Sequence, residues 1–334
     1  MKGRKRAIMM AGAISVAAVG LTACGSKTAA PTSVSSSSKP LIYVIGYQTN
    51  NPFWDTEGKG AIAAEKTFGV RVRYEAPSTA SSHGMINLIQ AALGAHPAGI
   101  AINYTGKIME SSVLTALHNG VKVVLYNNDR FGPQNGGATK NPSVTNLAFV
   151  GQNEHKSGGI LATHFLKYLP SSGGNILIIN PFPQAFVLTL RYNGVKSVLN
   201  AHGYKTHLLL ATGNETSNYH LIGAYLTAHP DIVGILGLGD PATNPAAQYV
   251  SAHHLNIPLA TFDMSPHTYQ LLRKVRQYKV ALDQQPYLQA YMAVEDLALN
   301  IKYGFQPVKV NTGTFVITKK NVSLLGRLVK AGLD

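Results

Sequence analysis

The chain has 334 residues, enough for two lobes of ordinary domain size around separate cores. Its single cysteine, Cys24, leaves the rest of the chain without disulfide bonds or thiolate metal ligands. The formal charge is +14, with 29 basic and only 15 acidic residues, but no run interleaves basic with aromatic residues, so no nucleic-acid partner is predicted. The acid-poor composition fits an acidic habitat or an anionic envelope, and loss of folding in mild acid would argue against the acidic habitat.

The beginning of the chain predicts an export signal that ends at Cys24. Basic residues among the first six are followed by an apolar segment, 7–20, that is too short and too rich in Ala and Gly to span a bilayer comfortably. The run Leu21-Thr22-Ala23-Cys24 resembles the lipobox of bacterial lipoproteins, whose cysteine carries diacylglycerol after cleavage. We therefore expect residues 1–23 to be a lipoprotein signal peptide and Cys24 to be lipidated, an ordinary secretory signal being the alternative. Residues 24–39 predict a flexible linker.

From residue 40 onward, short β-branched or apolar runs alternate with amphipathic stretches of helical period. The expected strands are 41–47, 70–75, 99–103, 122–127, 148–151, 175–180, 206–211, 233–238, 259–263 and 280–284. This alternation predicts an α/β protein with parallel sheets. A rough doubling, in which buried strands of the two halves end in Asp129 and Asp263, predicts two similar doubly wound lobes around a shared cleft.

Ligands of open parallel sheets bind outside the carboxyl ends of the strands, so residues after each predicted strand form the candidate site. The polar and aromatic residues at or soon after these ends are Asn51, Phe53, Trp54, Asp129, Arg130, Asp263 and Gln284, and Arg191 lies in the predicted helix that follows strand 175–180. Flat aromatic faces pack against the C–H face of a sugar ring, and carboxylates, guanidinium groups and amides bond vicinal hydroxyls. Each residue alone could be a helix cap, a surface ion pair or part of the core, but the agreement of five strand ends favours a sugar pocket.

Five short motifs in the same region carry a family resemblance. They are Asn51-Pro52-Phe53-Trp54, Asn128-Asp129-Arg130, Leu226-Thr227-Ala228-His229-Pro230-Asp231, Phe262-Asp263-Met264-Ser265-Pro266 and Asp283-Gln284-Gln285-Pro286-Tyr287-Leu288-Gln289. From residue 41 onward the chain resembles the type I periplasmic sugar-binding proteins, the ribose-binding-like substrate receptors of ABC transporters. The resemblance implies that Phe53 and Trp54 stack on the sugar. It also implies that six residues form hydrogen bonds to the sugar: Asn51, Asp129, Arg130, Arg191, Asp263 and Gln284.

The sequence departs from the ribose receptors at two places. Gly239 stands before Asp240 where those receptors have Asn, and Thr212-Gly213-Asn214 replaces a stretch that bears a third stacking aromatic. The smaller wall predicts room for a larger ring, a branched ligand or an extended polyol. Asn214 and Asp240 are candidates for new polar contacts, although both could equally be exposed loop residues.

The same resemblance implies a domain organisation and a mechanism. The N-terminal lobe comprises residues 40–149 and 286–311, and the C-terminal lobe comprises 150–285 and 312–334, with hinge crossovers near 149–151, 284–286 and 310–312. A monomeric receptor, lipid-anchored to the outer face of the cell membrane or periplasmic in a host with two membranes, binds a monosaccharide-like sugar or polyol. Closure of the lobes presents it to the ABC permease.

Two alternatives change the function. The turn Gly237-Leu238-Gly239-Asp240-Pro241-Ala242 weakly fits a G-x-G-x-x-A dinucleotide fingerprint of NAD-dependent enzymes, but it lies deep in the chain. No H-E-x-x-H or G-x-S-x-G motif is present, so no catalytic residue, metal or cofactor is expected. The second alternative is a sensor of a sugar, polyol or quorum signal coupled to a chemoreceptor or histidine kinase. Sugar-responsive repressors of this fold are excluded, because they carry a helix-turn-helix where this chain has its export signal.

Overall fold

The computed structural model describes residues 39–129, 139–331 and 333. The predicted signal peptide, Cys24 with its predicted lipidation, the predicted linker up to residue 38 and the candidate site residue Arg130 lie outside the described residues. From Lys39 onward the chain forms one compact unit.

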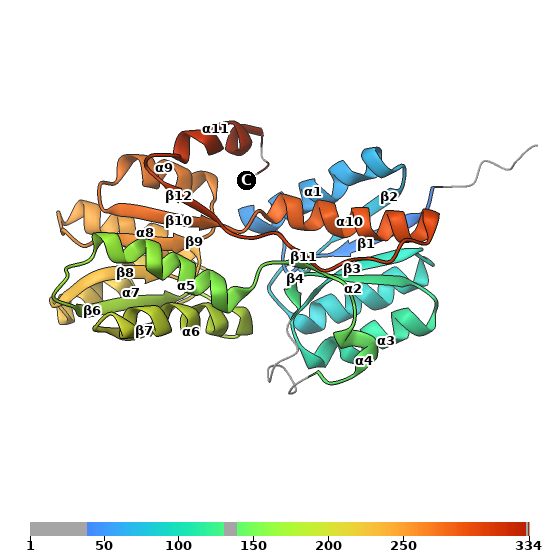
Figure 1. Cartoon of the computed structure of the whole chain (residues 1–334), viewed down its shortest axis with the longest axis horizontal. Helices are drawn as coiled ribbons and strands as arrows, with labels where there is room; N and C mark the ends of the chain where they lie inside the picture. The colour runs from blue at the N-terminus through green and yellow to red at the C-terminus, as the bar shows by residue number, and fades with distance from the viewer. Residues whose placement is uncertain (1–38, 130–138, 332, 334) are drawn as a thin grey trace, which may run out of the picture. The chain divides into compact units, whose positions relative to one another are not determined.

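Two six-stranded sheets form the centres of two lobes (Figure 1). The first sheet has the parallel order β11-β5-β4-β3-β1-β2. Its strands are β1 (Leu41–Ile45), β2 (Arg71–Glu75), β3 (Gly99–Tyr104), β4 (Lys122–Asp129), β5 (Phe149–Gly151) and β11 (Val310–Asn311). The second sheet has the order β12-β10-β9-β8-β6-β7, in which β12 runs antiparallel to β10 and the other neighbours pair in parallel. Its strands are β6 (Gly174–Asn180), β7 (Tyr204–Leu210), β8 (Ile232–Gly237), β9 (Leu259–Phe262), β10 (Tyr278–Asp283) and β12 (Phe315–Thr318).

Helices connect the strands, and several of them begin after a residue whose side chain caps the first turn. They are α1 (Pro52–Phe68), α2 (Ser82–Gly94), α3 (Glu110–His118), α4 (Pro142–Thr145), α5 (Glu154–Phe165), α6 (Phe186–Ala201), α7 (Glu215–Ala228), α8 (Asp240–Ala252), α9 (Pro266–Lys274), α10 (Pro286–Tyr303) and α11 (Val322–Ala331). The side-chain oxygens of Asn51, Asn153 and Ser265 accept backbone N–H groups in the first turns of α1, α5 and α9. In the part of the chain that the structure describes, no helix combines the length and the apolar character needed to cross a membrane.

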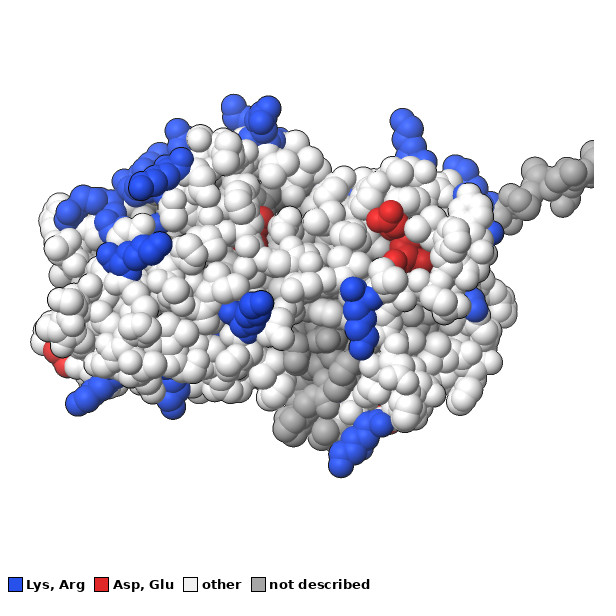
Figure 2. Space-filling view, viewed as in Figure 1, with Lys and Arg blue, Asp and Glu red and all other residues white. Residues whose placement is uncertain are grey.

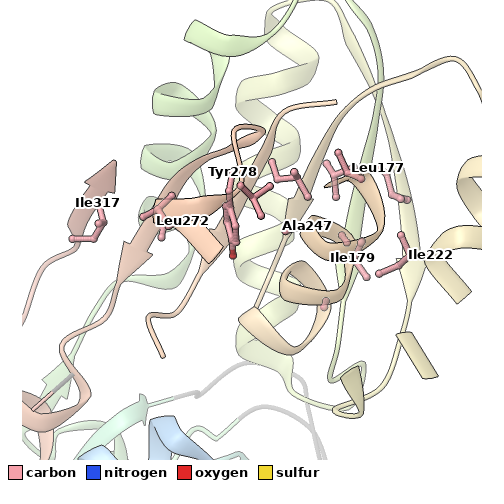
Figure 3. Close-up of a cluster of buried hydrophobic side chains, with 14 of the residues drawn as sticks. Leu177, Ile179, Ile222, Ala247, Leu272, Tyr278 and Ile317 are labelled. Carbon is pink, nitrogen blue, oxygen red and sulfur yellow. The ribbon is translucent and has the colours of Figure 1, made fainter. Parts of the chain in front are cut away.

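Apolar clusters cover both faces of each sheet, which explains why the central strands are nearly continuous apolar runs. In the second lobe, one cluster gathers side chains from β6, α7, α8, α9, β10 and β12 (Figure 3). Its labelled members are Leu177, Ile179, Ile222, Ala247, Leu272, Tyr278 and Ile317, all fully buried. Helices α5 and α6 cover the opposite face of the same sheet. Burial on both faces makes each lobe a rigid platform for the loops at its strand ends.

The chain crosses between the two sheets three times. It leaves the first sheet after β5 and enters the second lobe at α5, returns between β10 and α10, and crosses again between β11 and β12. All ten strands expected from the sequence are present, and the predicted fold class of two doubly wound, mainly parallel lobes with three crossovers is confirmed. Strands β11 and β12, of two and four residues, were not among the predicted strands.

Basic residues that are separate in the sequence gather on the second lobe. Figure 2 shows Lys and Arg side chains over the region of α9 and β12. The exposed basic residues of these two elements and the residues that follow them are Arg273, Lys274, Arg276, Lys319 and Lys320. They come together because β10 and β12 pair with Val280 opposite Thr318. Basic residues that are scattered along the sequence are therefore clustered on the folded surface.

Helix α10 returns from the second crossover to lie beside α1 (Figure 1), and their backbones approach closely at Gly60. A Cβ atom at Gly60 would lie 2.1 Å from the carbonyl oxygen of Tyr287. We expect Gly60→Ala to lower the free energy of unfolding by roughly 1–3 kcal/mol, because the two helices must separate. Urea unfolding measures this change. Gly94→Ala is the control: Gly94 ends α2 and its Cβ would meet nothing within 4 Å, so equal destabilisation of both variants would contradict the prediction.

Candidate functional site

A cavity lies between the two lobes at the carboxyl ends of their strands and opens to solvent; its empty space, with the solvent at its mouth included, is about 740 Å³. The first lobe contributes Tyr47, Asn51, Phe53, Trp54, Thr105, Asn127 and Asn128. The second lobe and the second crossover contribute Phe182, Gln184, Arg191, Asp240, Asp263, Gln284 and their neighbours at 185–188, 238–239 and 241. The sequence analysis names ten candidate site residues, counting Asn214 and Asp240. The cavity brings seven of them together: Asn51, Phe53, Trp54, Arg191, Asp240, Asp263 and Gln284.

The first lobe presents an aromatic wall at the start of α1. The Oδ1 atom of Asn51 accepts the backbone N–H of Phe53 at 3.0 Å, which fixes the turn after β1. The rings of Phe53 and Trp54 meet nearly edge to face, with centroids 4.7 Å apart, and Tyr47 packs against Trp54 with centroids 5.3 Å apart. These three half-buried rings form an aromatic wall, and a ring face in it suits the C–H face of a ring-shaped ligand.

Amide side chains at the end of β4 complete the first-lobe wall. The Nδ2 atom of Asn127 donates to Oε1 of Gln289 in α10 at 2.9 Å, and Nδ2 of Asn128 donates to Oδ1 of Asn103 in β3 at 2.6 Å. Asn127 has φ of 54°, a left-handed conformation that Asn tolerates. Asp129 is the last residue of β4, and its side chain lies outside the described part of the structure, as Arg130 does.

Arg191 is the central charge of the second-lobe wall and is 4% exposed. Its Nε donates to Oε2 of Glu154 at 2.6 Å and its Nη2 donates to Oε1 of Glu154 at 3.3 Å. Nη2 also donates to Oε1 of Gln284 at 2.7 Å, and Nη1 donates to the carbonyl of Leu238 at 3.1 Å. Burial lowers the pKa of Arg191, but Glu154 and then Asp263 outweigh this effect, so its pKa lies above the ordinary value.

Two carboxyl groups face the cavity from the same lobe. Asp263 follows β9 with φ of 72°, accepts a hydrogen bond from Nε2 of Gln284, and has Oδ1 3.9 Å from Nη1 of Arg191. Burial raises the pKa of Asp263 to about 7, Arg191 opposes this rise, and the neighbouring Asp240 adds to it. Burial likewise raises the pKa of Asp240 to about 6, against hydrogen bonds from Ser265 and Thr268. The two acids therefore titrate near neutral pH.

Phe182 changes the picture of the pocket walls that the sequence predicts. It follows β6 and lines the cavity, and a Cβ atom on Gly213 would lie 2.8 Å from its ring. The expected vacancy at Gly213 is therefore wrong, because the ring of Phe182 occupies that space. Gly239 offers no vacancy either: its Cβ would meet Pro181 at 3.2 Å and Oδ2 of Asp263 at 3.3 Å.

Two lining residues that were not predicted, Thr105 and Phe182, share a position in the sequence soon after a strand. Thr105 and Phe182 follow β3 and β6 directly or nearly so, and applying the strand-end rule to every strand would have found both. Asn214, in contrast, is not among the lining residues. Its Oδ1 accepts the backbone N–H of Ser217 at 2.9 Å, so it caps α7.

The glycine-rich turn at 237–242 is poorly suited to a dinucleotide. It joins β8 to α8, as the fingerprint requires, but Asp240 stands in the first turn of the helix and the Asp263 carboxylate lies beside Gly239. A pyrophosphate at this helix N-terminus would meet two acidic groups where the motif normally presents bare backbone N–H groups. Within the described residues, no group of three or more His, Cys, Asp or Glu side chains is arranged to hold a metal ion.

The raised pKa of Asp263 predicts the pH dependence of stability without ligand. Between its ordinary value of 3.8 and about 7, the folded state binds more protons than the unfolded state, so this group makes stability fall as pH rises. The slope is at most about 1.4 kcal/mol per pH unit. We expect the stability of Asp263→Asn relative to wild type to rise across this window and to level off above it. Urea unfolding from pH 4 to 8 measures the difference, with Glu75→Gln as a control in β2; a difference that is constant with pH would contradict the prediction.

Comparison with known proteins identifies the architecture. Residues 42–304 match the family described as periplasmic binding protein domain. The chain is 25% identical over 299 residues to the xylose/arabinose-binding protein XylF of Sulfolobus acidocaldarius, covering 84% of this chain and 71% of that protein.

Solved structures share the fold over nearly their whole length. A carbohydrate transporter protein from Acidothermus cellulolyticus 11B, in complex with myo-inositol, is 27% identical with a TM-score of 0.76, covering 89% of this chain and all of that one. An ABC transporter solute-binding protein from Burkholderia graminis C4D1M, in complex with D-arabinose, is 23% identical with a TM-score of 0.76, covering 87% of this chain and 99% of that one. The resemblance to type I periplasmic sugar-binding proteins is thus confirmed. The chain belongs to the periplasmic binding protein domain family and is a binding protein, not an enzyme.

Proposed function

We propose that the protein is an extracytoplasmic receptor that binds a monosaccharide-like sugar or polyol between its lobes and delivers it to an ABC importer. The observation that carries this proposal is the pairing of unlike walls in one cavity. An aromatic wall with Phe53 and Trp54 lines the cavity together with a polar wall containing Arg191, Asp263 and Gln284. Sugars have apolar C–H faces and a rim of hydroxyl groups, so such walls match both parts of the ligand.

The ligand residues that we propose follow from this arrangement. Phe53, Trp54 and Phe182 pack against the ring. Its hydroxyl groups are bonded by Asn51, Asp129, Arg130, Arg191, Asp263 and Gln284, with Asn127, Asn128 and Asp240 as further polar contacts. Since Phe182 occupies the space beside Gly213, the pocket is proposed to take a single compact ring and not a branched ligand.

The names of similar proteins support a neutral ligand of this size. Those names include a xylose/arabinose-binding protein, a glucose-galactose binding protein, and complexes with D-arabinose, alpha-D-tagatopyranose and myo-inositol. Pentoses, hexoses and a cyclic polyol share a ring of hydroxyl-bearing carbons. We place the ligand of this protein in the same chemical class.

Transport follows from motion about the three crossovers. In the proposed mechanism the ligand binds to one wall of the open form, and closure brings the other wall into hydrogen-bonding distance and excludes water. The permease then recognises the closed form. Lipid on Cys24 is proposed to hold the receptor at the outer face of the cell membrane, with the linker up to residue 39 allowing it to reach the permease.

A thermal-shift screen tests the proposed function. The full chain is heated with D-xylose, L-arabinose, D-glucose, myo-inositol or, as the control ligand, NAD. A ligand that binds only the native state stabilises it by RT ln(1 + [L]/Kd), about 2.7 kcal/mol at a hundredfold excess over Kd. We expect at least one sugar or polyol, and not NAD, to raise the melting temperature; a shift with NAD alone, or with none of these sugars and polyols, would sink the proposal.

Variants of the aromatic wall test where the ligand binds. We expect Trp54→Ala and Phe182→Ala each to weaken binding of the responding sugar at least tenfold, because each removes a ring face from the ligand. Titration calorimetry measures the affinity. Tyr303→Ala is the matched control, since Tyr303 is 64% exposed at the end of α10 and does not line the cavity. Unchanged affinity in both wall variants would show that the cavity is not the sugar site.

A further inference from the structure

Glu154 is the buried acid behind the second-lobe wall, and it does not line the cavity. It stands just after the first crossover, at the start of α5, where Asn153 caps the helix. Its exposed fraction is 1%. A carboxylate so deeply buried is costly unless it is paired, so its partner indicates its role.

That partner is Arg191, which Glu154 binds through both carboxylate oxygens, at 2.6 and 3.3 Å. With the bonds to Leu238 and Gln284, four of the five N–H groups of the guanidinium are used. The remaining N–H is on Nη1, the atom 3.9 Å from Asp263. Glu154 therefore orients the guanidinium group of Arg191 and occupies two of its N–H groups, which reduces the number of N–H groups that can bind the ligand.

The backbone holds this pair in place. Helices α5 and α6 cross at glycines: a Cβ atom on Gly158 would lie 2.2 Å from the carbonyl oxygen of Arg191, and one on Gly194 would lie 2.0 Å from that of His155. Only glycine permits so close an approach. The packing of the two helices thus sets the spacing of the backbones that carry Glu154 and Arg191.

The same carboxylate also connects the wall to the hinge. Nε2 of Gln152, in the first crossover, donates to Oε2 of Glu154 at 3.1 Å and to Oε1 of Gln284, in the second crossover, at 2.9 Å. Gln284 in turn donates to Asp263. One buried network therefore joins two hinge segments to Arg191 and Asp263, two of the charged residues that line the cavity.

We propose that Glu154 is a positioning residue of the ligand site. It fixes Arg191 and offsets its charge, so that the Asp263 carboxyl group stays available to the ligand and is not captured by a close ion pair with Arg191. This inference rests on the proposed sugar-binding function and adds to it a residue that does not contact the ligand.

The proposal predicts a change in the titration of Asp263. The charged and polar groups that face Asp263 are Arg191 from α6, Asp240 from α8, Glu154 from α5 and Gln284 from the crossover. Glu154 raises the pKa of Asp263 and Arg191 lowers it. Burial and Asp240 also raise this pKa, but without the charge of Glu154 one raising effect is lost while that of Arg191 remains, so the pKa of Asp263 moves below about 7.

The experiment compares Glu154→Gln, Glu154→Asp and the control Glu75→Gln, at a half-buried acid in β2 that does not line the cavity, in the full chain. The first readout uses no ligand: the stability difference between Asp263→Asn and its parent, measured from pH 4 to 8, gives the titration midpoint of Asp263 in each background. We expect this midpoint to fall by at least half a pH unit in Glu154→Gln. It stays in place in Glu154→Asp, which keeps the charge, and in Glu75→Gln.

The second readout is the affinity for whichever of D-xylose, L-arabinose, D-glucose or myo-inositol stabilises the wild type. We expect at least a tenfold loss in Glu154→Gln, a smaller loss in Glu154→Asp, whose shorter side chain cannot hold both Arg191 and Gln152, and none in Glu75→Gln. A Glu154→Gln variant with the wild-type midpoint and affinity overturns the inference. If Glu154→Gln does not fold, wild-type affinity in Glu154→Asp overturns it. A wild type that binds none of these ligands contradicts the proposed function, while the ligand-free titration still decides whether Glu154 controls Asp263.

Discussion

The buried charge of Arg191 is the constraint around which the second-lobe wall is built. A guanidinium group that is 4% exposed must be paired, and the structure pairs it with an acid behind the wall and leaves a second acid at 3.9 Å on the cavity side. The glycine-lined crossing of α5 and α6 makes this arrangement possible, because larger residues would push the two helices apart. Orientation of the polar wall is therefore a consequence of helix packing.

The side chains of the two cavity walls are held in place by different kinds of interaction. In the first lobe, an Asn cap and a Pro-initiated helix hold aromatic rings in place by local interactions within a few residues. In the second lobe, polar groups from five segments are held by a network that reaches into two crossovers. A motion about the crossovers therefore acts on the polar wall directly, which suits a receptor whose bound and free states must differ in shape.

Much of the candidate site could be predicted from the sequence, because strand ends in a parallel sheet lie at one edge. Asn51, Phe53, Asp263 and Gln284 were found by that rule, and local motifs supported them. The rule does not say which space is empty: the vacancy at Gly213, expected from the departure from the ribose receptors, is filled by Phe182 from a loop about thirty residues earlier. It also could not find Glu154, since a buried acid one residue inside a helix has the same local pattern as an ordinary helix N-terminus.

The sequence by itself determined every strand except β11 and β12, and the two-lobed parallel architecture, because strand and helix periodicity is encoded within a few neighbouring residues. It also determined which side chains stand at strand ends. Only the tertiary structure decided which of these residues meet, which ring fills which space, and where the pKa of an acid lies. Those properties depend on contacts such as Glu154 with Arg191 and Gln152 with Gln284, which join residues far apart in the chain and leave no local pattern in the sequence.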